Sequence, residues 1–104
     1  MQFAPVLGNV RATIDRIEKL SAYCVGVDLL VLPELCNSGY NFESQEQAWA
    51  TSEEIGGGVF LQYLESLCLR LGCHIASGLN ERQGSHLYNS AVLVGPQGYV
   101  GRYR

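Results

Sequence analysis

The chain has 104 residues, a length that fits one compact domain and leaves no room for a second. Hydrophobic residues make up 47% and charged residues 16%, a composition that is typical of a globular protein and excludes a disordered one. The net charge is −3 and the seven Lys and Arg residues are scattered, so no basic stripe predicts binding to nucleic acid. The longest apolar run, residues 29–33, is far below the ~20 residues of a bilayer crossing, and we expect a soluble, cytoplasmic protein that does not bind a membrane.

The chain begins with a weak polar and apolar alternation that stops at Pro5, so residues 2–6 are expected to be the end of a strand. Asn9 is a candidate N-cap, and apolar residues follow it at helical spacing: Val10, Ile14, Ile17, Leu20 and Cys24. This pattern predicts an amphipathic helix that ends by Gly26.

Residues 29–32 form a continuous apolar run, which predicts a parallel strand buried on both faces. A short helix is expected within residues 45–54, followed by a loop at the three glycines 56–58. This loop lacks the Lys-Ser/Thr pair of a nucleotide site. A second amphipathic helix is predicted for residues 59–71, with Gly72 as its cap.

The last third of the chain predicts three strands. Residues 74–79 and 87–94 have strand patterns, residues 80–85 are polar and turn-like, and a Gly-Pro-Gln-Gly turn at 95–98 leads to a final strand at 99–104. The order of elements predicts an α/β fold, with helices on one face of a mostly parallel sheet that gains antiparallel strands.

Cysteines and histidines give no metal pattern. The four cysteines contain no CxxC pair, so we expect reduced and mostly buried thiols. His74 and His86 lack a second ligand at metal spacing and are expected to be structural.

One carboxylate, Glu34, directly follows the apolar run 29–33. Reacting groups in open α/β sheets collect at the carboxyl ends of strands, because the loops leaving those ends line the crevice. Pro33 fixes its φ and biases Leu32 toward an extended conformation, so the strand should end sharply and direct Glu34 into the loop region. The position of Glu34 directly after a strand allows two interpretations: it is a general base, or it is a glutamate on the protein surface.

Four stretches, taken in order, resemble the nitrilase or carbon-nitrogen hydrolase superfamily. LVLPELCNSGY at 30–40 resembles the signature in which Pro-Glu, followed by Gly-Tyr, supplies the catalytic glutamate. LYNSAVLVGPQGYVGRYR at 87–104 resembles the strand, turn and strand that lead into the catalytic lysine, and QFAPVLGNV and GLNER are similar to the family too. Each motif alone is moderately specific, whereas the ordered set spans the whole chain and is highly specific.

The resemblance implies part of a four-layer αββα sandwich and a Glu-Lys-Cys triad in which Glu34 is the base for a cysteine thiol. The implied substrate is a small amide, carbamoyl compound or nitrile, with no cofactor. It also implies that Tyr40 lines the substrate pocket, although an aromatic lid packed on the core is the alternative. The family usually pairs subunits, so a homo-oligomer is expected at full length.

The other candidates do not complete a triad. Lys19, the only lysine, lies on the polar face of the first helix and does not match the catalytic one. Cys36 is expected to be a loop or pocket-wall residue, because the family's nucleophile comes from a later segment. Asn89 is expected to satisfy backbone groups near the hairpin.

The sequence stops just before the position of the family's lysine. We therefore predict that residues 1–104 are the amino-terminal part of one carbon-nitrogen hydrolase domain, inactive alone and with an apolar sheet face left partly uncovered. Two alternatives remain, a glutamine-hydrolysing amidase domain of a larger synthetase and a non-catalytic binding module with the same fold.

Overall fold

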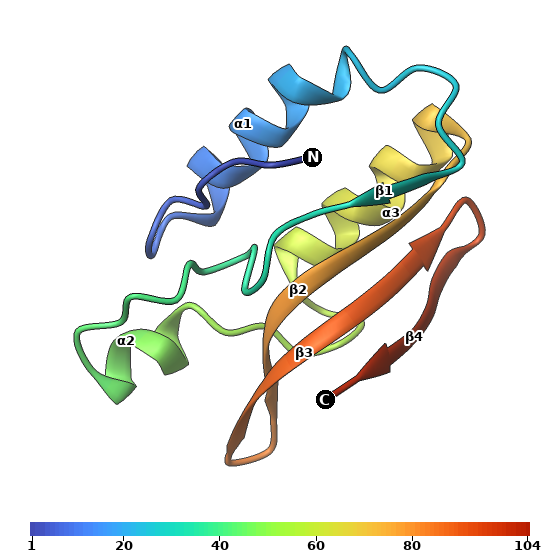
Figure 1. Cartoon of the computed structure of the whole chain (residues 1–104). Helices are drawn as coiled ribbons and strands as arrows, with labels where there is room; N and C mark the ends of the chain where they lie inside the picture. The colour runs from blue at the N-terminus through green and yellow to red at the C-terminus, as the bar shows by residue number, and fades with distance from the viewer.

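A computed structural model describes all 104 residues as a four-stranded mixed sheet with three helices (Figure 1). The elements, in chain order, are α1 (Val10–Ser21), β1 (Leu29–Val31), α2 (Gln45–Ala50), α3 (Val59–Leu71), β2 (His74–Gln83), β3 (His86–Gly95) and β4 (Gly98–Tyr103). The sheet order is β1-β2-β3-β4; β1 is parallel to β2, and the other two pairs are antiparallel. The α/β class is confirmed, but the prediction of a mostly parallel sheet is wrong, because tight hairpins join the last three strands.

The helix signals in the sequence are largely confirmed. The Asn9 side chain accepts a hydrogen bond from the Ala12 N–H at 3.0 Å, so it is the N-cap of α1. The helix ends at Ser21, well before Gly26. Helix α3 has the predicted bounds, and Gly72 terminates it in the left-handed region with φ 67°. None of the helices has the length and hydropathy needed to cross a bilayer.

The core lies between α3 and one face of the sheet. Its centre is built from residues of α3, β2 and β3 and from one residue of α1. The fully buried side chains of this centre are Ile17, Phe60, Leu64, Leu67, Ile75, Leu79, Val92 and Val94. Helix α1 contacts α3 rather than adding a layer on the opposite face. The helical layer therefore covers one side of the sheet, as predicted.

The opposite sheet face is open, which corrects the expectation for β1. Leu30 is buried, but Leu29 and Val31 on either side of it are 54% and 55% exposed. Successive side chains of a strand point to opposite faces, so only one of every two can reach the helical layer. Tyr103 on the edge strand β4 is also exposed. The predicted uncovered apolar face is thus present.

Two predicted local structures are wrong. Residues 2–6 form no strand, although the Met1 ammonium donates to the Val31 carbonyl at 2.8 Å and holds this segment beside β1. The predicted turn at 80–85 is mostly strand, because β2 continues to Gln83 and only Gly84 and Ser85 separate it from β3. Polar side chains do not end β2, since the buried ones find partners inside the fold: the Asn80 amide donates to the Ala48 carbonyl at 2.7 Å.

Candidate active site

Glu34 lies in a turn at the carboxyl end of β1. Backbone hydrogen bonds on both sides of it attach this turn to β2. The Gly78 N–H donates to the Pro33 carbonyl and the Cys36 N–H donates to the Gly78 carbonyl, each at 3.0 Å. The turn is therefore fixed to the sheet by backbone hydrogen bonds of the kind that hold a strand.

The turn depends on the backbone at three positions, two within the turn and one on the strand beneath it. Leu35 has φ 42°, a left-handed conformation that residues with a side chain rarely adopt. Gly39 has φ 72° and lies against Leu7. Gly78 lies so close beneath the turn that a Cβ atom there would be 2.4 Å from the Leu35 nitrogen and 2.5 Å from the Glu34 Cα. The close approach of two backbones explains why glycine occupies residue 78.

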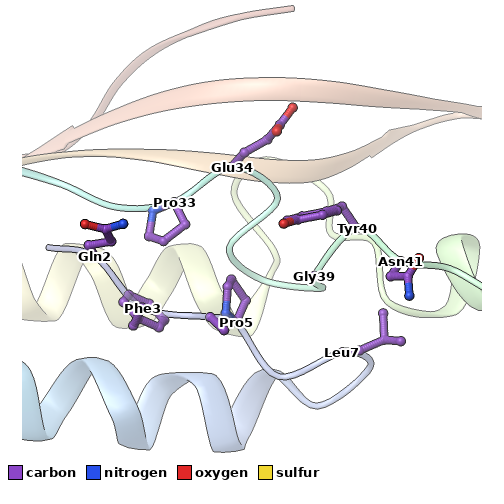
Figure 2. A pocket seen from close by; sticks show the side chains of 10 residues that line it. Gln2, Phe3, Pro5, Leu7, Pro33, Glu34, Gly39, Tyr40 and Asn41 are labelled. Carbon is purple, nitrogen blue, oxygen red and sulfur yellow. The ribbon is translucent and has the colours of Figure 1, made fainter.

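The Glu34 carboxylate is exposed and has one hydrogen-bond partner, the side-chain amide of Asn89 on β3. The Asn89 Nδ2 donates to Glu34 Oε1 at 2.7 Å, a length typical of a bond to a charged acceptor. Figure 2 shows the carboxylate directed toward the strands and away from Phe3 and Pro5. The expectation that Asn89 satisfies backbone groups is wrong, because its side chain reaches across the open sheet face to the turn.

A hollow of about 800 Å³ lies beside this turn, between the N-terminal segment and residues 39–41. Glu34 and Tyr40 both line it (Figure 2). Tyr40 is 68% exposed, which rules out the alternative of an aromatic lid packed on the core. Its contact with a substrate stays a prediction.

Two buried cysteines of the chain, Cys36 and Cys68, are poor nucleophiles. Cys36 follows Glu34 by two positions, but its side chain is fully buried in the core and does not line the hollow. Burial raises the pKa of the Cys36 thiol to about 12, so it is protonated at neutral pH. Burial also raises the pKa of Cys68 to about 11. Cys36 is therefore a loop residue, one of the two expected settings, but it packs in the core and does not form a pocket wall.

Neither a lysine nor a metal site accompanies Glu34. Lys19 lies in the last turn of α1 and is exposed. No group of three His, Cys, Asp or Glu side chains in the chain could hold a metal ion. Among the catalytic residues that the family resemblance implies, the chain thus places only the glutamate in an accessible position.

A second carboxylate, Glu81 on β2, was missed by the sequence analysis. It is fully buried and accepts hydrogen bonds from Ser90 Oγ at 2.5 Å and from Arg104 Nη2 at 2.6 Å, with Arg102 Nη1 at 3.2 Å. Burial alone would raise the pKa of Glu81, but the hydrogen bonds from Arg104 and Ser90 and the charge of Arg102 lower it overall. The sequence did contain a signal for a buried acidic partner, since Arg102 and Arg104 are at alternate positions of the predicted last strand and their side chains point to the same side.

Comparison with known proteins gives a consistent result. The whole chain, residues 1–104, matches the family described as carbon-nitrogen hydrolase. A nitrilase from Pyrococcus abyssi is 43% identical over 106 residues, which cover all of this chain and 40% of that protein. A protein N-terminal amidase from Schizosaccharomyces pombe is 32% identical over 107 residues, which cover 93% of this chain and 37% of the amidase.

The fold of the chain is also similar to that of solved structures. A crystal structure of an N-terminal amidase superposes with a TM-score of 0.91 and 27% identity, over all of this chain and 26% of that one. The likeness confirms the predicted fold class, an α/β chain that corresponds to part of an αββα sandwich. The chain spans 40% or less of the length of the curated relatives it matches.

Proposed function

This chain belongs to the carbon-nitrogen hydrolase family, and on that basis we propose that Glu34 is the general base of an enzyme that hydrolyses a small amide, carbamoyl compound or nitrile. The observation that supports this proposal best is the setting of the carboxylate. It projects from a strand end, it is solvent-accessible, and Asn89 engages only Oε1. Oε2 is left to accept a proton from a reacting group.

In the proposed reaction, Glu34 takes the proton from a cysteine thiol and the thiolate attacks the carbonyl or nitrile carbon. With an amide, the C–N bond then breaks and the leaving nitrogen receives the proton from Glu34. A water molecule next attacks the acyl thioester, Glu34 accepts its proton, and the carboxylic acid and free thiol are released. Three of the four thiols are buried and none of the four lines the hollow beside Glu34, so the proposal assigns the cysteine and the lysine to segments other than residues 1–104.

A chimera tests this role of Glu34. Residues 1–104 would replace the matching segment of the Pyrococcus abyssi nitrilase, which aligns with the whole chain at 43% identity. We expect the chimera to release ammonia from short nitriles or amides, and Glu34→Gln to lower kcat about 100-fold or more, because a positioned general base contributes about 10²- to 10⁴-fold. The measurement is ammonia release under saturating substrate.

The matched control is Glu43→Gln, which removes an exposed carboxylate outside the hollow and should leave kcat within about two-fold. The chain of 104 residues alone should release no ammonia above background. Full activity of Glu34→Gln in the chimera would contradict the proposal, and so would turnover by residues 1–104 alone.

A second candidate substrate is the amide of a peptide. It is favoured by the structural likeness to N-terminal amidases, one of them solved with an Asn-Glu-Ala peptide at a TM-score of 0.85 and 28% identity. The exposed side chains of Glu34 and Tyr40 also leave room for a larger substrate. A chimera with the rest of the Schizosaccharomyces pombe amidase, assayed with that peptide and with short nitriles, distinguishes the two substrate classes.

A further inference from the structure

We propose that Asn89 is a positioning residue for Glu34: its side-chain amide holds one carboxylate oxygen and thereby presents the other oxygen for proton transfer. This inference rests on the proposed function of Glu34 as a base. It adds a residue from a different strand, 55 positions further along the chain, to the arrangement around the base.

The geometry suits this role because both residues are anchored to β2. The turn that carries Glu34 is bonded to Gly78 of β2 through two backbone hydrogen bonds at 3.0 Å. Asn89 lies on β3 opposite Asn80, within the continuous antiparallel pairing of β2 and β3. The distance from Asn89 Nδ2 to Glu34 Oε1 is therefore set by the sheet rather than by two flexible loops.

The chemistry of an amide also suits a base. A carboxylate rotates broadly about its last torsion, so a fixed donor restricts which oxygen points to a reacting group. A lysine or arginine in the same place would form an ion pair and make the carboxylate a weaker base. The neutral amide of Asn89 orients Glu34 without adding a charge, and only its nitrogen can serve, since a carboxylate offers acceptors alone.

If Asn89 had only a structural role, its removal would lower the stability of the chain rather than the catalytic rate. Asn89 and Glu34 are both exposed, and an exposed hydrogen bond contributes little to stability. Loss of the bond should therefore leave the melting temperature of the chain nearly unchanged, whereas it should affect catalysis through the orientation of the base.

The first test measures the contact itself in the chain of 104 residues, without any activity. In ¹⁵N-labelled protein, the side-chain amide signals of Asn89 should shift in a single step when acid protonates Glu34. The step should disappear in Glu34→Gln, which keeps the size of the side chain but cannot titrate. Amide signals that do not respond to acid, or that respond equally in Glu34→Gln, would overturn the proposal whatever the chain catalyses.

The second test uses the nitrilase chimera. Asn89→Ala should lower kcat about 10- to 100-fold while KM changes little, because misorientation of a catalytic group costs rate rather than binding. Asn89→Asp keeps the shape but places a second carboxylate against Glu34, and two such groups resist simultaneous ionisation. The acid limb of its kcat/KM profile should therefore move to higher pH. Gln97→Glu adds the same charge at an exposed turn and should change neither kcat nor the position of the acid limb.

The outcomes separate this inference from the proposed function. If Glu34→Gln abolishes activity but Asn89→Ala and Asn89→Asp keep the normal kcat and pH profile, the positioning role is wrong and the base assignment stands. If the chimera is inactive, or active without Glu34, the proposed function fails and the positioning role fails with it. In either case the signals of Asn89 report separately whether the contact exists.

Discussion

Replacement of Gly78 by alanine is expected to lower the free energy of unfolding by about 3 kcal/mol, the upper range for overpacking, and to displace Glu34. The added Cβ would lie 2.4 Å from the Leu35 nitrogen and 2.5 Å from the Glu34 Cα. Both are backbone atoms, which cannot rotate away as the end of a side chain could. Strand β2 and the turn would have to separate, breaking the hydrogen bonds between Gly78 and the turn. Urea denaturation of the chain measures the stability change.

The matched control is Gly101→Ala on β4, where an added Cβ meets nothing within 4 Å and no left-handed φ is required. It should be neutral or stabilising, because alanine in a strand loses less backbone entropy on folding than glycine. In the nitrilase chimera, Gly78→Ala should also lower kcat, whereas Gly101→Ala should not. Equal stability of the two variants would show that the turn and β2 are not packed backbone to backbone.

The position of Glu34 could be predicted because its determinants are local. Pro33 ends the strand by its fixed φ and Glu34 directly follows it in the chain, so Glu34 had to lie at the carboxyl end of that strand. The helices were predictable for the same reason. Asn9 and Gly72 act through bonds to residues within a few positions of them.

The partner of Glu34 could not be predicted, because it depends on strand register. The polar residues 80–83 read as a turn, yet they pair with β3 and so determine where Asn89 lies. Because residues 80–85 were predicted to be a turn, the pairing that places Asn89 beside Glu34 could not be predicted. The exposure of Leu29 and Val31 was missed for a related reason, since burial on both faces depends on which layers cover the sheet and not on the strand itself.

The buried Glu81 gives the other large expected effect. Replacing Arg102 and Arg104 together by methionine should lower the free energy of unfolding by about 3 kcal/mol, since a buried charge would lose both cationic partners. We take the lower end of the usual range because the two arginine side chains are 29% and 31% exposed and water already screens them. Glu81→Gln should cost less, about 1 kcal/mol, because it removes the charge together with its ion pairs. Urea denaturation at neutral pH measures both.

The pH dependence of these variants identifies the charge of Glu81 as the cause. The pKa of Glu81 is lowered in the folded chain, so its contribution is complete above the ordinary carboxyl pKa and is lost as the pH falls through the lowered value. The stability difference between the wild-type chain and Glu81→Gln should therefore shrink as the pH falls below about 4, the ordinary carboxyl pKa, and disappear once Glu81 is protonated in the folded chain. Glu18, whose pKa is also lowered, is present in both proteins and cancels from the difference. A difference that persists undiminished in acid would mean that shape rather than charge makes Glu81 stabilising.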